Sequence, residues 1–333
     1  MSETRFADIG KVEAVARLFD DTPYKPFESM DFESSTKGGF SVSATSLLLE
    51  GIDFDLVYYP LKHLGYKSVL SVAGELYASL AHPALLSVRL GISAKLDFEQ
   101  IRELWGGIVT AAREHGFKKV SLDLQPSKNG LAIALSAMGE TATITRKRCP
   151  SAHSKDLICV SGSLGAAFMG LQVLERGKAD FARAKEDIGK YKMLVGSYLK
   201  PDLQPDVVSS LEEEEIYPSG GYFVRQGLSD AVKRIARDSG MGVKIYADKI
   251  PFEGNTFALG KEMNIDPISA AMNGGEDYRL LFTIPILSLE KFRKNFQTFD
   301  IIGHLALPEA GTVLVTPDGL EIPVRAQGWP EEY

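Results

Sequence analysis

The chain has 333 residues, of which 44% are hydrophobic and 24% charged, with 31 glycines and 16 prolines. A chain of this length and composition can bury the cores of two ordinary globular domains. Its formal net charge of −7 and its lack of a basic run argue against a nucleic-acid partner. No apolar stretch reaches the roughly 18 residues that a membrane helix needs, and the sequence MSETRFADIG at the start lacks the apolar region of a signal peptide. With 2 cysteines and 5 scattered histidines, the sequence favours a cytoplasmic protein without a disulfide framework or a zinc site.

The first part of the chain alternates between helical and irregular patterns. Residues 11–19 carry apolar side chains at helical spacing, and residues 20–43 are typical of a loop with one short strand. The clearest amphipathic helix is predicted over 97–115, where the apolar side chains fall on one stripe. Asp97 and Gln100 stand at the spacing of a capping box at its start.

Two strands and a domain boundary follow this helix. The alternating run 117–124 and the apolar run 131–138 predict strands. The next stretch, 141–155, is polar and rich in turn-forming residues. We therefore predict two domains, covering 1–148 and 149–333.

The second half shows the same interleaving of strands and helices. Residues 156–162 read as a strand that runs into a glycine turn. Further elements are predicted as helices over 163–175, 228–238 and 288–296, a strand over 278–284, and short strands towards the end. The fold class is therefore α/β or α+β, while the order of the strands stays open.

Two glycine-rich turns are the clearest local signals for a ligand, because the chain has no phosphate-binding loop of the P-loop or dinucleotide type. The turn SGSLG at 161–165 could present backbone amides to an anion, or could simply allow tight packing of strand and helix. The segment GGEDYRLLFTIP at 274–285 places two glycines and two carboxylates just before an apolar strand. Such carboxylates suit a polar ligand or a metal, but the segment could equally be a simple turn. The acidic run 212–215 is interpreted as a solvated surface.

The segment GGEDYRLLFTIP resembles a hallmark of thiamine-monophosphate kinases, which are related to aminoimidazole ribonucleotide synthetase and selenophosphate synthetase. Other stretches agree with that family in order and spacing. They are LLLEGIDFD at 47–55, PLKHLGYKSVL at 60–70, DLICVSGSLGAAFMGLQVLE at 156–175, SGMGVKIYADKIPF at 239–252 and AQGW at 326–329.

The resemblance implies a two-domain fold like that of aminoimidazole ribonucleotide synthetase. Residues 1–148 would be the ATP-binding and dimerisation domain, with strands of both subunits pairing into a barrel-like interface, and 149–333 the substrate-side domain. The implied reaction moves the γ-phosphoryl group of ATP onto thiamine monophosphate, giving thiamine diphosphate. The family holds Mg²⁺ with clusters of aspartates rather than with a P-loop.

Most of the aspartates that the resemblance implies for Mg²⁺ are absent in the first half. The early G-D-D-A-A segment falls near Ser29 and Met30, and the T-D motif becomes Thr45-Ser46. The N-L-S-D segment retains a carboxylate as Glu75, and the G-G-D segment retains Asp123. These two are the metal ligands that the resemblance leaves.

The second half departs further from the family pattern. The D-I-S-D-G-L motif reads FVRQGL, so Phe223 and Gln226 replace its acids and Arg225 its serine. Arg225 could hold a phosphate directly or fill the old site with a salt bridge. The arginine expected before the second domain aligns beside Arg148. We therefore assign Arg225, Gln226, Ser46 and Arg148 to nucleotide or phosphate binding.

The substrate side is better preserved than the metal side. The resemblance assigns Gly274, Gly275, Glu276, Asp277, Tyr278 and Trp329 to substrate binding. Trp329 could stack on a pyrimidine ring, or could pack in the core.

Three functions follow from these departures. The first is a thiamine-monophosphate kinase relative that has lost or strongly reduced its activity but still binds a small phosphate ligand. The second is an active kinase with an altered metal site, and the third is an enzyme of the same fold with another phosphorylated substrate. The resemblance further implies a homodimer, and the first function allows a heteromer with a motif-complete relative; the missing aspartates argue against the family's Mg²⁺ and ATP arrangement.

Overall fold

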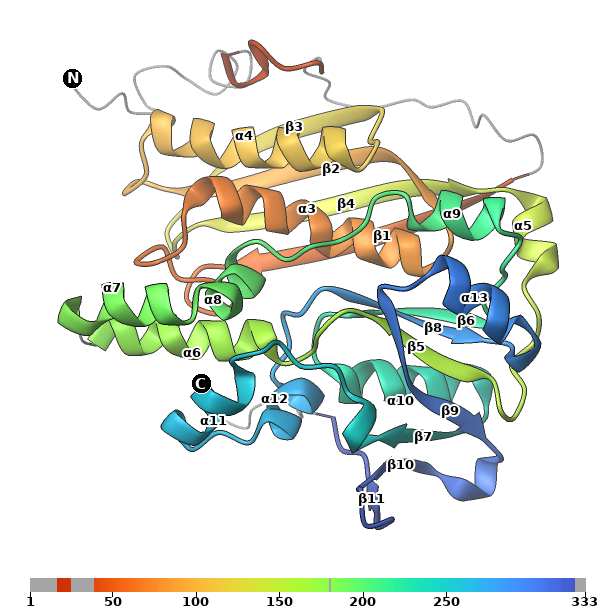
Figure 1. Ribbon diagram of the computed structural model, residues 1–333. Helices are drawn as coiled ribbons and strands as arrows, with labels where there is room; N and C mark the ends of the chain where they lie inside the picture. The colour runs from red at the N-terminus through yellow and green to blue at the C-terminus, as the bar shows by residue number, and fades with distance from the viewer. Residues whose placement is uncertain (1–16, 25–38, 180, 327–333) are drawn as a thin grey trace. The chain divides into compact units, whose positions relative to one another are not determined.

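The computed structural model describes residues 17–24, 39–179 and 181–326. Two compact units make up the chain (Figure 1), Met1–Thr143 and Ile144–Tyr333. The strands of the described residues form one sheet in each unit, here called the N-terminal sheet and the C-terminal sheet. The mixture of strands and helices confirms the α/β fold class.

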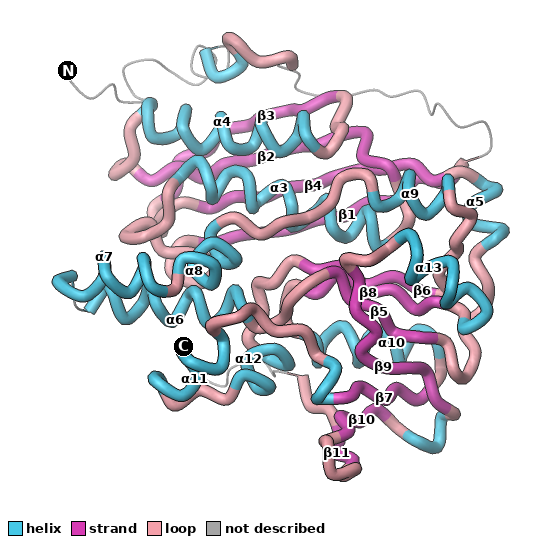
Figure 2. Tube along the Cα trace, viewed as in Figure 1, coloured by secondary structure: helices cyan, strands magenta, loops and turns pink. Residues whose placement is uncertain are grey.

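The N-terminal sheet has the strand order β1-β4-β2-β3, in which β2 and β3 run parallel and the other neighbours antiparallel. Helices α3 and α4 lie on one face of this sheet (Figures 1 and 2). The elements of this unit are β1 (Phe40–Leu49), α3 (Leu61–Ala78), β2 (His82–Ser93), α4 (Phe98–Glu114), β3 (Lys119–Ser127) and β4 (Ala132–Thr141).

The helix pair crosses closely because each helix presents a glycine to the other. A Cβ atom on Gly65 would lie 2.0 Å from the carbonyl oxygen of Leu104, and one on Gly107 would lie 2.0 Å from that of Lys62. Any larger residue would force the two backbones apart. The core beneath them is formed by alternate strand residues, because successive side chains of a strand point to opposite faces. Val88, Leu90, Val120, Leu122, Ile133 and Leu135 are buried there.

Helix α4 confirms the predicted start and end of the amphipathic helix. The Asp97 carboxylate accepts a hydrogen bond from the Gln100 backbone N–H at 2.8 Å, and the Gln100 side chain accepts one from the Asp97 N–H at 3.0 Å. Gly116 follows with φ of +77°, which ends the helix.

The C-terminal sheet has the strand order β11-β10-β7-β9-β5-β8-β6. The α-helices and strands from residue 143 onward are α5 (Thr143–Arg148), β5 (Leu157–Ser161), α6 (Ala166–Ala179), α7 (Phe181–Lys190), α8 (Lys192–Leu199), α9 (Val207–Glu213), β6 (Gly220–Val224), α10 (Leu228–Ser239), β7 (Gly242–Tyr246), α11 (Thr256–Met263), α12 (Pro267–Asn273), β8 (Arg279–Ile284), α13 (Leu289–Asn295), β9 (Phe299–Ala306), β10 (Thr312–Val315) and β11 (Glu321–Pro323). Short 3₁₀ helices are η1 (Ala247–Lys249), η2 (Ile286–Ser288) and η3 (Pro308–Ala310).

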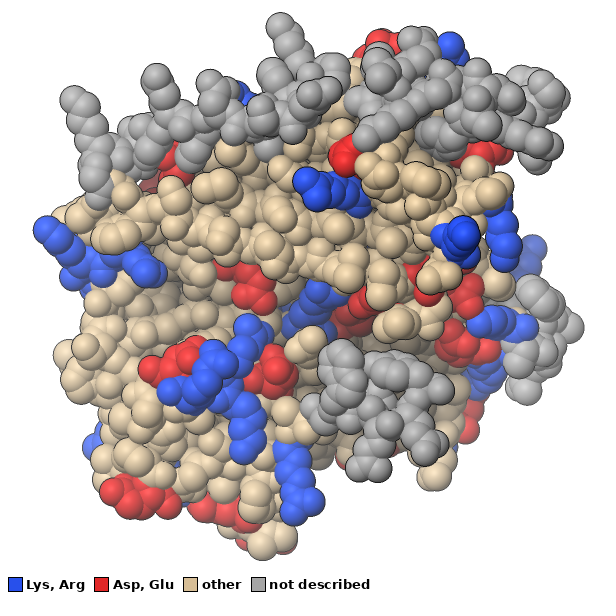
Figure 3. Space-filling view, turned by 180° about the vertical axis from the view of Figure 1, so that it is seen from behind, with Lys and Arg blue, Asp and Glu red and all other residues tan. Residues whose placement is uncertain are grey.

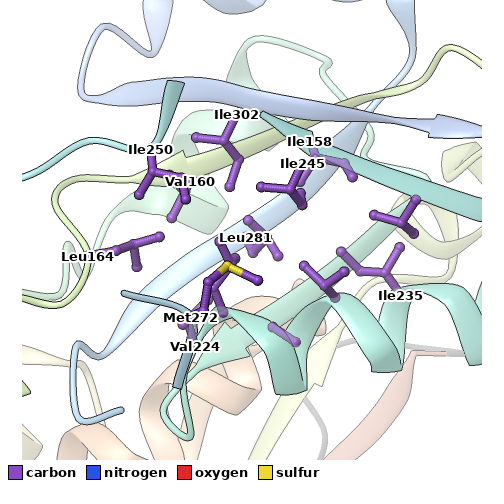
Figure 4. Packing of buried hydrophobic residues seen from close by; sticks show 14 of the residues in the cluster. Ile158, Val160, Leu164, Val224, Ile235, Ile245, Ile250, Met272, Leu281 and Ile302 are labelled. Carbon is purple, nitrogen blue, oxygen red and sulfur yellow. The ribbon is translucent and has the colours of Figure 1, made fainter. Parts of the chain in front are cut away.

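One face of the C-terminal sheet carries the core of this unit. Figure 4 shows side chains from neighbouring strands meeting above α10, among them Ile158, Ile245, Leu281 and Ile302, with Ile235 on the helix. All five are fully buried. Burial of apolar area of this kind is the main force that holds the sheet and α10 together.

Two segments differ from their sequence predictions. Residues 40–43, from the stretch predicted as a loop with one short strand, begin the 10-residue strand β1, which pairs with β4 along its whole length. Residues 143–148, expected in a polar turn, form the helix α5. The helix predicted over 11–19 lies mostly outside the described residues, of which 17–19 are helical.

The acidic run 212–215 has specific partners in this unit. Glu212 accepts a hydrogen bond from the Thr145 hydroxyl at 2.7 Å, Glu214 from the Asn295 amide at 2.6 Å, and Glu215 from Arg148 at 2.7 Å. The run lies on the surface, as the sequence suggested, and its hydrogen bonds also tie α9 to α5 and α13. On the face drawn in Figure 3, Lys and Arg side chains lie beside Asp and Glu. None of the helices in the described part of the chain has the length and apolar character that crossing a membrane requires.

Candidate functional site

The two glycine-rich turns meet in the C-terminal unit. The turn 161–165 connects β5 to α6, and the turn 274–278 connects α12 to β8. Asp277 joins them, since its carboxylate accepts hydrogen bonds from the backbone N–H groups of Gly165 at 2.8 Å and Ala167 at 3.2 Å. The amides that could have faced an external anion therefore face an anion that the chain itself supplies.

Backbone conformation explains why glycines occupy these turns. Gly162, Gly165 and Gly275 have φ of +84°, +74° and +76°, values that residues with a Cβ atom rarely adopt. Glu276 and Tyr278 also have positive φ, 64° and 55°. Strained backbone at residues other than glycine persists only where the surrounding structure holds it, and such places are often functional.

Asp277 is 3% exposed, and its burial raises the pKa of the carboxyl to about 6. The hydrogen bonds from Gly165 and Ala167 and the charge of Arg279 act in the opposite direction, because they favour the ionised form. The removal of the carboxylate from water outweighs them. Asp277 is thus a buried helix cap in this structure, with no exposed oxygen set aside for a ligand.

Arg225 and Glu276 form an ion pair beside these turns. The Arg225 Nε lies 3.7 Å from the Glu276 Oε1, and each side chain is 21% exposed. The backbone N–H of Glu276 also donates to the carbonyl of Arg225 at 2.6 Å. Of the two roles that the sequence left open for Arg225, the salt bridge is therefore present. Gln226, the next residue, is exposed.

Phe223 and Tyr278 pack against each other in the core below the turn. Their rings meet edge to face, with centroids 5.4 Å apart and an interplanar angle of 90°, a geometry that aromatic pairs favour. Both are fully buried. The Tyr278 ring therefore serves packing, and Phe223 cannot offer a metal an oxygen.

Arg279 was missed by the sequence prediction, although it directly follows the predicted turn. Its guanidinium donates to the carbonyl of Ser163 at 3.3 Å and to that of Asp202 at 3.1 Å. It lines a hollow of about 210 Å³ together with Gly162 and Asp202. Its two hydrogen-bond partners are neutral carbonyl groups, which orient the guanidinium but do not offset its positive charge.

Arg148 is engaged at another place in the same unit. Its guanidinium donates to Glu215 at 2.7 Å and to the Tyr217 hydroxyl at 2.9 Å, and it lies 5.5 Å from the centre of the Tyr217 ring. Those contacts fix the end of α5 against the segment after α9. Its predicted role in phosphate binding stays a prediction.

The residues predicted in the N-terminal unit do not come together. Glu75 lies on α3, which packs over β1 and β4. Asp123 lies on β3 at the opposite edge of the sheet, and it alternates with the buried Leu122 and Leu124, which places it on the face away from the helices. Ser46 on β1 alternates with Thr45 and shares the helix-covered face with Leu48.

Comparison with known proteins supports the resemblance. No family model matches the chain. A thiamine-monophosphate kinase from Pyrococcus horikoshii is 27% identical over 277 residues, which cover 80% of this chain and 78% of the relative. Among solved structures, thiamine monophosphate kinase from Aquifex aeolicus superposes with a TM-score of 0.72 at 23% identity, covering 87% of this chain and 92% of that one.

Two further solved structures share the fold. AaThiL complexed with AMPPCP and TMP gives a TM-score of 0.71 at 23% identity, over 87% of both chains. HypE from E. coli, a hydrogenase maturation protein, gives 0.68 at 14% identity, over 95% of this chain and 96% of HypE. In sequence the chain is similar to thiamine-monophosphate kinases, and its fold is the aminoimidazole ribonucleotide synthetase-like fold of these neighbours.

The residues present do not fit the magnesium cluster that thiamine-monophosphate kinases imply. Phe223 is apolar and buried, Glu276 is paired with Arg225, and Asp277 caps α6. Within the described ranges, no three His, Cys, Asp or Glu side chains lie close enough together to hold a metal ion. Trp329 and the positions near Ser29 and Met30 lie outside the described residues, so their predicted roles stay predictions.

Proposed function

We propose that this chain is a thiamine-monophosphate kinase-like protein that keeps the fold and binds a small phosphate-bearing ligand, but has lost or strongly reduced kinase activity. The segment 223–226 carries the proposal. Where the family motif has acids, Phe223 is buried against Tyr278 and Gln226 is a neutral amide, while Arg225, in place of the motif's serine, is paired with Glu276.

The charges around Arg225 oppose binding of Mg²⁺. Phosphoryl transfer needs Mg²⁺ to neutralise the phosphates, and Mg²⁺ needs carboxylate oxygens or the phosphates themselves. Arg225 brings a positive charge to a place where the family has metal-binding acids, and it occupies the Glu276 carboxylate. The positive charge of Arg225 repels a cation such as Mg²⁺.

The retained acids of the N-terminal unit do not compensate for this loss. Glu75 and Asp123 lie on different layers and towards different edges of the N-terminal sheet. This placement does not favour a single magnesium ion held by both, since Mg²⁺ requires ligand distances of about 2.0–2.1 Å. An active kinase with a site built from these two carboxylates is therefore the less favoured alternative.

A phosphate-bearing ligand still has a charged group to bind in the C-terminal unit. Arg279 lines the hollow of about 210 Å³ beside the 161–165 turn, and two backbone carbonyls orient it. Oriented guanidinium groups are the usual partners of phosphate and carboxylate groups in proteins. We place the phosphate of the ligand against Arg279, and leave ring recognition to Trp329 as the resemblance implies.

We further propose that the protein is a homodimer formed through the open face of the N-terminal sheet. Described helices α3 and α4 cover one face, and the other carries the exposed side chains Leu47 and Met138. A sheet face of this kind suits pairing with a second copy, as in the barrel-like interface of the family. A cytoplasmic location agrees with the free thiols of Cys149 and Cys159.

A kinase assay tests the loss of activity. Thiamine diphosphate formation from ATP, Mg²⁺ and thiamine monophosphate would be measured beside a thiamine-monophosphate kinase with all its aspartates. We expect a rate at least about a thousandfold lower than that of the control, which corresponds to about 4 kcal/mol in the barrier. A rate within about tenfold of the control would show an active kinase with an altered metal site.

A binding measurement tests the retained ligand site. Titration with thiamine monophosphate in a calorimeter should give saturable binding that Arg279→Gln weakens about tenfold, while the exposed Arg237→Gln leaves it unchanged. Lack of binding, with binding of another phosphorylated compound in its place, would favour an enzyme of the same fold with a different substrate. Light scattering after size exclusion distinguishes the homodimer from a monomer that awaits a motif-complete partner.

A further inference from the structure

A second hollow lies on the C-terminal sheet and shares no lining residue with the hollow beside Arg279. Its volume is about 280 Å³, and it is lined by strands β5, β7 and β9 together with residues of η1, η2 and α13. Val243 and Ile245 of β7 belong to the core cluster of Figure 4. Lys244 and Tyr246 alternate with them, so the hollow opens on the face opposite that core.

Three cationic side chains from three separate segments line this hollow. Lys155 precedes β5, Lys249 ends η1 and Arg293 lies on α13. Within the described part of the chain, none of the three forms an ion pair, and the lining includes no Asp or Glu. Like charges that converge without a counter-ion repel each other, and an anion would relieve that repulsion.

Two carboxylates near the hollow, those of Asp156 and Glu321, bind other partners. Asp156, next to Lys155 in sequence, is buried and accepts hydrogen bonds from the His153 backbone N–H at 3.0 Å and from the Ser219 hydroxyl at 2.8 Å. Glu321 is paired with Lys244 on the same face of β7. These two carboxylates therefore do not balance the positive charge of the hollow, and Asp248 and Asp300, which adjoin Lys249 and Ile301 in sequence, are not among its lining residues.

One wall of the hollow is aromatic. The rings of Tyr246 and His304 are stacked, with centroids 5.8 Å apart and an interplanar angle of 26°, and the Tyr246 hydroxyl lies 3.4 Å from the His304 Nδ1. Burial and the nearby Lys244 lower the pKa of His304, so the ring is neutral near pH 7. Gly303 adds no side chain to the floor between them. A flat, uncharged surface thus adjoins the three cations.

We propose that this hollow binds a small phosphate monoester of an aromatic ring compound, with its phosphate among Lys155, Lys249 and Arg293 and its ring against Tyr246 and His304. Two lysines and an arginine suit a dianionic phosphate better than a single carboxylate. The volume is near the lower limit of small-molecule sites, which begin at about 300 Å³, and favours a compact ligand with one ring. The site uses none of the residues of the kinase-like function and is independent of it.

Calorimetric titration of the full-length protein with 4-nitrophenyl phosphate tests the site. We expect saturable binding that weakens at least about fivefold in Lys249→Gln and in Arg293→Gln, because each removes one of the three charges. Lys294→Gln is the matched control, since Lys294 follows Arg293 on α13, is exposed, and is absent from the lining. It should bind within about twofold of the unchanged protein.

Two further titrations identify which part of the ligand is recognised. The phenol 4-nitrophenol should not bind measurably, and inorganic phosphate should bind more weakly than the ester, a difference that Tyr246→Leu should abolish. Absence of saturable binding by the ester would overturn the proposal. So would binding that survives Lys249→Gln and Arg293→Gln together, since the ester would then occupy another site such as the hollow beside Arg279.

Discussion

Two positively charged environments of the C-terminal unit differ in how their charge is met. At the start of α6, backbone N–H groups of Gly165 and Ala167 face the carboxylate of Asp277, which comes from the chain itself. In the hollow between β7, β9 and α13, Lys155, Lys249 and Arg293 share no carboxylate among the described residues. One site is internally neutralised, and the other is open to an external anion.

The difference shows that a sequence motif for anion binding does not establish that the site can accept a ligand. The SGSLG turn has the sequence of an anion-binding turn, yet its amides already serve as the partners of a buried side chain. The basic hollow carries no recognisable motif, because its cations come from positions 155, 249 and 293. A ligand site must therefore be judged by which charges remain uncompensated after folding.

The largest expected effect comes from removing the internal anion. Asp277→Ala leaves two buried N–H groups without an acceptor and should lower the free energy of unfolding by about 3 kcal/mol. Asp277→Asn keeps one acceptor and removes the buried negative charge, so it should cost much less than Asp277→Ala. Chemical denaturation at pH 7.5 measures both. Equal stability of Asp277→Ala and the unchanged protein would show that Asp277 does not hold the turn.

The pH dependence of stability tests the electrostatics of the same carboxyl. Its pKa of about 6 in the folded protein exceeds the ordinary 3.8, so the folded state binds the proton more tightly than the unfolded state. This contribution to stability is fully present below pH 3.8 and is lost as the pH rises to about 6. Relative to Asp277→Asn, the unchanged protein should thus lose up to about 3 kcal/mol across that interval. A gain over the same interval would mean that the N–H bonds outweigh burial.

The ion pair of Arg225 and Glu276 should have a smaller effect, because both side chains are partly exposed. A double-mutant cycle with Arg225→Gln and Glu276→Gln should give a coupling energy of about 0.5–1 kcal/mol. The coupling should decrease in high salt. A coupling energy of zero would contradict a stabilising salt bridge and favour phosphate binding, the other role that the sequence left open for Arg225.

The smallest expected change concerns the basic hollow without a ligand. Lys249→Gln removes one of three repelling charges and should raise the free energy of unfolding by a few tenths of a kcal/mol at low salt. Lys294→Gln, on the exposed surface of α13, should change it less. Thermal denaturation at low and high ionic strength measures this, and destabilisation by Lys249→Gln would mean that Lys249 has a partner in the fold.

Local sequence patterns predicted the elements whose signals are local. The capping box of Asp97 and Gln100, the strand β8 and the helix α10 all follow from residues within one element. The resemblance assigned Asp277 to a ligand site, whereas its partners in the structure, Gly165 and Ala167, lie more than 100 residues away in the chain. Nothing in the sequence around either turn could reveal that pairing.

The positions of the metal ligands predicted in the N-terminal unit likewise depend on packing that the sequence does not show. Glu75 and Asp123 were taken from separate motifs, and their positions depend on helix packing and on strand alternation. Alternation could have been read from the strand 117–124, where Leu122 and Leu124 flank Asp123. That signal alone places Asp123 on the face opposite the core, but the position of α3 needed the structure.

A single-turnover experiment tests the loss of phosphoryl transfer most directly. The protein, in molar excess over γ-labelled ATP, would be incubated with Mg²⁺ and saturating thiamine monophosphate, and labelled thiamine diphosphate would be counted. An excess of protein reveals even one slow transfer per molecule, which a steady-state assay can miss. If phosphoryl transfer is lost, we expect no more labelled product than forms without protein. Transfer of the label in stoichiometric yield would contradict it and show that replacement ligands complete a working magnesium site.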